Sequence, residues 1–180
     1  MDDIGFWILV SIGIVVSVML ATAVIGIFLP RLHRVTCALA LKQTPEVVWQ
    51  VVTDHAHLPE WHAKVTKVER LLDKRGHEVW RETYKGDYGL VLETTEVSPP
   101  TRLVRTITDE KGPFTGRWEF TLTPTETGCR LSITEFGAVR NPFFRFMIRL
   151  FMKPEVYLEM YLQALAHKFG EPATIEKYVV

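Results

Sequence analysis

The stretch that decides the fold runs from Asn141 to Gly170 and reads NPFFRFMIRLFMKPEVYLEMYLQALAHKFG. Asn at the N-cap and Pro at the first helical position open a helix, and Gly170 with Pro172 beyond it ends one. Pro154 lies inside the pattern, so we expect it to kink this long helix or to split it in two. The apolar side of the helix must be buried against the sheet that the rest of the chain supplies.

Strand-like segments fill most of the chain before this helix, and turn residues separate them at hairpin spacing. Alternation is clearest in residues 116–123, where Trp118, Phe120 and Leu122 share one face. The other segments are 35–41, 65–72, 77–84, 88–97, 102–108 and 129–136. We therefore predict an α+β fold in which an antiparallel seven-stranded sheet wraps around the long C-terminal helix.

A short helix interrupts the strands after the first of them. Thr44, Pro45 and Glu46 supply an N-cap, a first helical position and an acid in the first turn, so a helix is expected over 45–53. Residues 54–61 then form either a loop or a second helical turn.

The N-terminal segment has a different character, because no residue from Ile4 to Leu29 carries a charge. A membrane-spanning helix needs about 20 apolar residues, so this run is long enough. The alternative is a cleaved signal peptide, but the acidic start at Asp2 and Asp3 and the length of the run disfavour it. We expect a single-pass transmembrane anchor at 1–30, a domain at 31–172 and a C-terminal tail at 173–180.

Basic residues follow the apolar run directly, at Arg31, Arg34 and Lys42. The positive-inside rule then predicts the N-terminus outside and the domain in the cytoplasm. Only Pro30 to His33 connect the run to the first strand, so the domain must stay close to the bilayer. Cys37 and Cys129 have no metal or redox spacing, which suits a reducing compartment.

Composition and motifs exclude several classes of function. The chain has 21 basic and 21 acidic side chains, which is no nucleic-acid signature. His55, His57 and His62 crowd one region, but they lack a standard ligand spacing, so we expect no metal. The sequence contains no nucleophile elbow, phosphate loop or dinucleotide fingerprint, and we expect no cofactor.

Several local strings resemble one superfamily. They are TPEVVW at 44–49, LPEW at 58–61, VSPPTRL at 97–103, GRWEF at 116–120 and GCRL at 128–131. With the element order, they resemble the START-like (SRPBCC, helix-grip) superfamily, particularly its bacterial polyketide-cyclase/dehydrase-like branch, over about residues 34–170. The resemblance implies a cavity between sheet and C-terminal helix for an apolar or amphipathic ligand.

Candidate ligand-binding residues are those placed where they could line such a cavity, although aromatic side chains also simply fill cores. They are Trp61, Trp80, Tyr84, Arg105, Trp118, Phe120, Glu135, Phe146 and Leu150. Glu135 is also the weak candidate for a catalytic group, and Arg105 is its candidate partner across the sheet. The alternative for Glu135 is an exposed strand end, because acids are seldom buried alone.

Three functions fit these features. The leading one is a membrane-anchored module that binds a membrane lipid, an isoprenoid quinone or a similar apolar small molecule. The others are a polyketide-cyclase-like enzyme that acts on an apolar substrate and an accessory subunit with a membrane-protein partner. Whether the protein is an enzyme stays open, and the sequence leans towards no enzymatic activity. Arg145, Arg149 and Lys153 either contact anionic lipid or form the solvated face of their helix.

Overall fold

The computed structural model describes residues 3–108, 114–151 and 155–179. Its helices are α1 (Asp3–Phe28), α2 (Pro45–Thr53), α3 (Leu58–Trp61), α4 (Pro142–Phe151) and α5 (Glu155–Lys168), with a 3₁₀ turn at His55–His57. Its strands are β1 (Leu32–Leu41), β2 (Val65–Arg70), β3 (Val79–Tyr84), β4 (Tyr88–Ser98), β5 (Arg102–Ile107), β6 (Phe114–Thr125), β7 (Gly128–Val139) and β8 (Ile175–Val179).

The strands form one antiparallel sheet in the order β2-β3-β4-β5-β6-β7-β1-β8. The predicted α+β helix-grip architecture is confirmed, but the sheet has eight strands where seven were expected. The additional strand, β8, lies within the segment expected to be a tail and pairs with β1 from Val35↔Val179 to Leu39↔Ile175. It satisfies the backbone groups on the outer edge of β1, which would otherwise be an open strand edge.

The long C-terminal helix is split, as the internal proline predicts. α4 begins after Asn141, whose side-chain oxygen accepts a hydrogen bond from the Phe143 amide at 2.9 Å. Pro154 itself lies outside the described residues. At α2 the sequence prediction needs a small correction, because Thr44 occupies the N-cap position but makes no side-chain capping bond.

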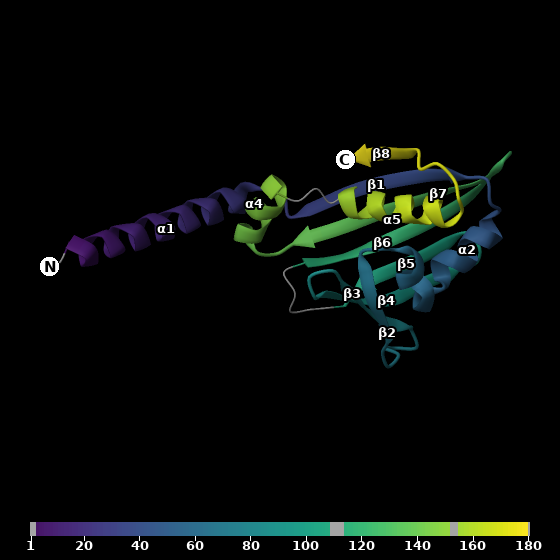
Figure 1. Cartoon of the computed structure of the whole chain (residues 1–180), viewed down its shortest axis with the longest axis horizontal. Helices are drawn as coiled ribbons and strands as arrows, with labels where there is room; N and C mark the ends of the chain where they lie inside the picture. Colours follow the sequence, from purple (N-terminus) through teal and green to yellow (C-terminus); the bar gives the residue numbers. More distant parts are fainter. Residues whose placement is uncertain (1–2, 109–113, 152–154, 180) are drawn as a thin grey trace.

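The core lies between the sheet and the helices on its concave face. α2 contributes Val48 and Val52, and α5 contributes Leu158, Leu162 and Leu165, all of them buried. They pack on inward-facing residues of β1 and of β5 to β7. Figure 1 shows α2 and α5 lying across the same side of the sheet, so the sheet curves around α5.

α1 projects from one end of this domain as a long helix (Figure 1). Within the described residues it is the one helix long and apolar enough to cross a membrane by length and composition. The sheet begins almost at once after it, because the Val139 amide donates to the Arg31 carbonyl at 3.0 Å. The start of β1, the end of β7 and the turn between β3 and β4 all lie at this same end of the sheet.

A cavity with a buried polar cluster as the candidate functional site

A cavity of about 940 Å³ lies between the concave face of the sheet and α5. Its wall is mostly apolar, with Leu90 from β4, Phe120 from β6, Ile133 from β7 and Met160 from α5. The volume lies at the upper end of the range for small-molecule sites. The helix-grip geometry thus leaves space that the side chains do not fill.

The mouth of the cavity can be located from the exposed residues in its wall. Lys64, Lys85 and Tyr88 border it on the β2 and β3–β4 side, and Val156 and Tyr157 border it at the start of α5. The β3–β4 turn is at the end of the sheet from which α1 projects. The opening therefore lies on the side of the domain that faces α1.

The cavity wall includes some of the residues singled out in the sequence and not others. Tyr84, Arg105, Trp118, Phe120 and Glu135 line it. The other candidates do not.

Trp61 packs edge-on against Tyr161 in the core, with ring centroids 5.2 Å apart. Trp80 stacks on the His55 ring at 5.3 Å. Phe146 is half-buried on α4, and Leu150 is exposed there. A ligand-contacting role remains a prediction for all the candidates.

A buried ionic cluster, which the sequence analysis missed, occupies one wall. Glu82 on β3 is buried, and its carboxylate lies 2.7 Å from His55 Nε2. The imidazole N–H is poorly aligned with that oxygen, whereas the Tyr84 hydroxyl donates a short hydrogen bond to the other one. Burial opposes ionisation of Glu82, but His55, Tyr84 and the charge of Arg105 outweigh it and lower its pKa.

The same surroundings keep His55 neutral. Desolvation by burial lowers the pKa of His55 first, and the positive charge of Arg105 lowers it further, against the pull of Glu82. His55 Nδ1 has no hydrogen-bond partner among the described residues. The cluster therefore combines an ionised carboxylate, a neutral imidazole and a phenol whose pKa burial and Glu82 raise well above its usual value.

Arg105 brings a buried positive charge to the cavity wall. Its Nη2 donates to the Val52 carbonyl at 2.9 Å, and its guanidinium lies 5.6 Å from the centre of the Phe120 ring. Within the described structure its Nε, His62 Nδ1 and the Tyr161 hydroxyl are buried without a well-formed hydrogen bond. Burial raises the pKa of Tyr161 and lowers that of His62. Buried polar groups left unpaired are costly, so these three are suited to pair with a polar group of a ligand.

A second polar group lies nearer the α1 end of the cavity. Glu135 is held by His33 Nε2 at 2.9 Å and by the Trp118 indole N–H at 3.0 Å. The His33 ring fills the space above Gly137, where a Cβ atom would come within 2.0 Å of it. Glu135 is therefore a partly buried, partnered carboxylate facing the cavity, and its partners are His33 and Trp118; no bond joins it to Arg105.

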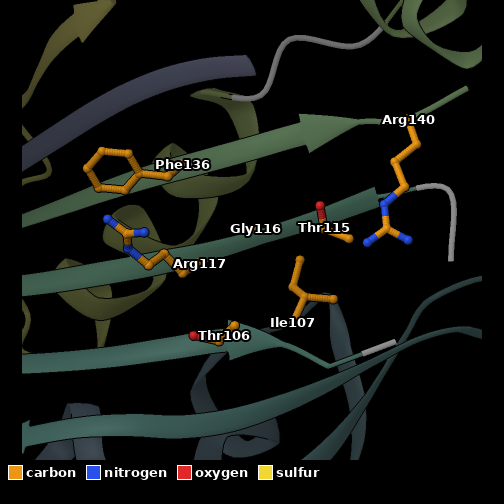
Figure 2. Close-up of a pocket in the computed structure, with 7 residues that line it drawn as sticks. All are labelled: Thr106, Ile107, Thr115, Gly116, Arg117, Phe136 and Arg140. Atoms are coloured by element: carbon orange, nitrogen blue, oxygen red, sulfur yellow. The ribbon is translucent and has the colours of Figure 1, made fainter. Parts of the chain in front are cut away.

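A smaller pocket of about 360 Å³ adjoins the cavity at the ends of β5 and β6. Figure 2 shows Arg117 lying beneath the Phe136 ring, with Arg140 at the far side of the pocket. The Arg117 guanidinium is 4.4 Å from the ring centre and its Nε donates to Glu119 at 2.7 Å. Arg117 also lines the larger cavity, whose greater volume makes it the stronger candidate for a ligand.

The cavity can bind an apolar molecule and present polar groups to it. No three His, Cys, Asp or Glu side chains among residues 3–108, 114–151 and 155–179 converge as a metal site would require. What the wall offers is hydrogen bonding from Arg105, His62 and Tyr161 and proton acceptance by Glu82. Glu82 could have been found in the sequence, because it sits between Trp80 and Tyr84 at alternating positions of one strand.

No curated protein matches the chain in sequence. Solved structures with the same fold include an aromatase/cyclase, Zhui, from a Streptomyces species, at 14% identity and TM-score 0.64, covering 76% of this chain and 93% of that one. A START superfamily protein from Mycobacterium smegmatis has 15% identity and TM-score 0.60, with 76% and 96% covered. A Mesorhizobium loti protein has 21% identity and TM-score 0.60, also with 76% and 96% covered.

The sequence profile of one family covers most of the chain. It is described as polyketide cyclase/dehydrase and lipid transport, and it matches residues 33–169. That match includes β1 from His33 onwards, β2 to β7 and the helices α2 to α5, and therefore every element that forms the cavity, whereas β8 lies beyond it. The chain thus belongs to the polyketide cyclase/dehydrase and lipid transport family, and its START-like domain is a module for hydrophobic ligands.

Proposed function

We propose that this protein is a membrane-anchored binding module that takes a lipid, an isoprenoid quinone or a similar apolar molecule from the adjoining bilayer. The observation that carries the proposal is the place of the cavity mouth. It opens at the end of the domain where α1 is attached, beside the β3–β4 turn and the start of α5. An apolar ligand that partitions into the membrane would be presented to that opening.

The connection between helix and domain supports the same proposal. α1 ends at Phe28, and the Arg31 carbonyl already accepts a sheet hydrogen bond from the Val139 amide. So short a connection leaves the domain little freedom to leave the surface. With α1 across the bilayer and Arg31 and Arg34 following it, the domain faces the cytoplasm.

The anchor is tested on the full chain in its membrane. A retained α1 predicts that the intact mass of the protein includes the N-terminal residues and that alkaline carbonate does not extract it. A cleaved signal sequence gives a shorter protein that carbonate releases, which would contradict the anchor.

The ligand is tested by purifying the full chain in mild detergent and analysing it by native mass spectrometry. Met160 lines the cavity, whereas Gln163, one turn further along α5, is exposed. We expect Met160→Trp to narrow the cavity and lower the amount of a co-purifying apolar molecule, while Gln163→Trp leaves that amount unchanged. If all three proteins carry the same molecules, the ligand lies elsewhere than in the cavity.

The buried cluster supports a second candidate, a cyclase-like enzyme. An ionised carboxylate beside a neutral imidazole in a largely apolar cavity is suited to accept a proton from a bound substrate. Glu82 and His55 supply that pair at 2.7 Å. Glu82→Gln keeps the shape of the side chain but removes the base.

The two candidates differ in what Glu82→Gln carries after purification. For an enzyme, the variant accumulates the unconverted substrate, so its bound molecule differs in mass or in double bonds from that of the wild type. For a binding module, wild type and variant hold the same compound, with at most a change in occupancy.

A further inference from the structure

α4 has an unusual distribution of side chains for a surface helix. Arg145 is only 5% exposed, whereas Leu150 is 61% and Phe144 is 40% exposed. Phe143 and Met147 are half-buried between them, with the Phe143 and Phe144 rings in edge contact at 6.0 Å. At 3.6 residues per turn these four apolar side chains occupy an arc of about 120°. A helix facing water presents its polar side outwards, and α4 presents an apolar one.

The inward side of α4 is fixed to the end of α1. Arg145 Nη1 donates to the Leu29 carbonyl at 3.0 Å, and Nη2 donates to the Arg140 carbonyl at 3.2 Å. Gly26 is the buried residue of α1, and a Cβ atom there would come within 1.9 Å of the Pro142 carbonyl oxygen. Arg145 thus binds backbone carbonyls and is no lipid contact. Lys153, its companion in the sequence pattern, lies outside the described residues.

The place of this apolar surface indicates what covers it. It lies at the point where α1 leaves the domain, beside side chains of α1 that are themselves apolar and exposed, such as Ile25 and Ile27. Figure 1 shows α4 beside the domain end of α1. An apolar surface continuous with a membrane-spanning helix meets the acyl boundary of the bilayer first.

We propose that α4 is an interfacial helix that lies in the plane of the bilayer surface next to α1. Phe144 and Leu150 enter the acyl boundary, and the exposed Arg149 lies on the opposite side of α4, away from the lipid. The inference rests on the proposed membrane anchor. It adds a second point of attachment, which holds the domain in one orientation with the mouth of the cavity at the lipid surface.

The test uses the full chain in vesicles of phosphatidylcholine and phosphatidylglycerol, with single cysteines labelled by an environment-sensitive fluorophore. Cys37 and Cys129 are fully buried, so introduced cysteines are labelled selectively. The reporters are Phe144→Cys and Leu150→Cys on α4 and Ser17→Cys within α1. Leu72→Cys is the matched control, because Leu72 is apolar, 94% exposed and at the opposite end of the sheet.

Quenching by lipids with a spin label near the head of the acyl chain separates the outcomes. We expect strong quenching at positions 144 and 150, at least threefold above that at position 72, and quenching at 17 by labels deep in the bilayer. Quenching at 17 with none above control at 144 and 150 overturns the interfacial helix but leaves the anchor standing. An absence of quenching at position 17 would contradict the anchor, and with it the interfacial helix. Self-quenching between labels at 144 without lipid quenching assigns the surface to a second copy and overturns the proposal.

Discussion

The Arg145 guanidinium donates to the backbone carbonyl of Leu29 at 3.0 Å and so joins α4 to the C-terminal end of α1. The last carbonyls of a helix have no partner within it, so a cation placed there satisfies one of them and offsets the helix dipole. This bond couples the long apolar helix α1 to the helix that follows the sheet. The C-terminal end of α1 is thereby part of the folded structure of the domain.

Arg145→Met therefore leaves the Leu29 and Arg140 carbonyls without their donor. We expect a loss of about 1–3 kcal/mol in the free energy of unfolding, because a buried charged hydrogen bond is removed. Thermal and denaturant unfolding of the full chain in detergent measure it. Arg149→Met is the control, since Arg149 is exposed, and equal effects of the two substitutions would contradict the role of the Leu29 bond.

Gly26→Val tests the close approach of α1 and α4. A Cβ atom at Gly26 meets the Pro142 backbone, whereas one at Gly13 meets nothing within 4 Å. We expect Gly26→Val to push α4 away from α1. Trypsin should then cleave after Arg145 at least tenfold faster, because Arg145 is buried in the native state. Gly13→Val should leave the rate unchanged, and a rate unaltered by both substitutions would refute the packing.

Tyr84→Phe removes the hydroxyl that donates to the Glu82 carboxylate. We expect a loss of about 1–3 kcal/mol in the free energy of unfolding at pH 7, where the buried carboxylate is ionised. The loss should shrink as the pH falls and Glu82 gains a proton. Tyr157→Phe, at an exposed tyrosine of α5, is the control. An equal loss of stability in that variant would contradict a specific role of the Tyr84 hydroxyl.

The pH dependence of stability has a sign fixed by the buried histidines. The pKa values of His55 and His62 are lowered in the folded state, so below about pH 6.5 the unfolded chain takes up protons that the folded chain does not. Stability is therefore greatest above that pH and falls from pH 7 to pH 5. The lowered pKa of Glu82 acts in the same direction at lower pH.

Denaturant titrations at pH 7.5, 6 and 5 check this prediction. We expect His55→Gln to flatten the decline between pH 7.5 and 5. The exposed His57 has its pKa raised by Asp54, so its contribution has the opposite sign and His57→Gln should not flatten the decline. A wild-type protein as stable at pH 5 as at pH 7.5 would contradict the buried neutral state of His55.

The fold was largely predictable because most helices and strands are marked by signals in their own local sequence. Asn141 and Pro142 mark the start of α4, and alternation marks β6 around Trp118 and Phe120. The eighth strand was missed because IEKYV at 175–179 is short and gains its stability from the edge of β1, a contact that the sequence does not display.

The candidate site was less predictable because period-2 alternation gives the face of a residue and not its partners. Arg105 and Glu135 do line the cavity, but their contacts are with Val52 and His33, which come from distant elements. Glu82 draws its surroundings from the turn at His55–His57, whose packing over β3 only the tertiary fold reveals. The burial of Arg145 likewise depends on α1, more than a hundred residues away.

The central claim, that the cavity takes an apolar molecule from the bilayer, is tested most directly by photo-crosslinking in native membranes. A benzophenone side chain replaces Leu90, which lines the cavity, or Gln163, which is exposed on α5. After irradiation, mass spectrometry of the peptides should find a lipid-soluble small-molecule adduct at position 90 and none at position 163. No adduct at position 90, or the same adducts at both positions, would contradict the account.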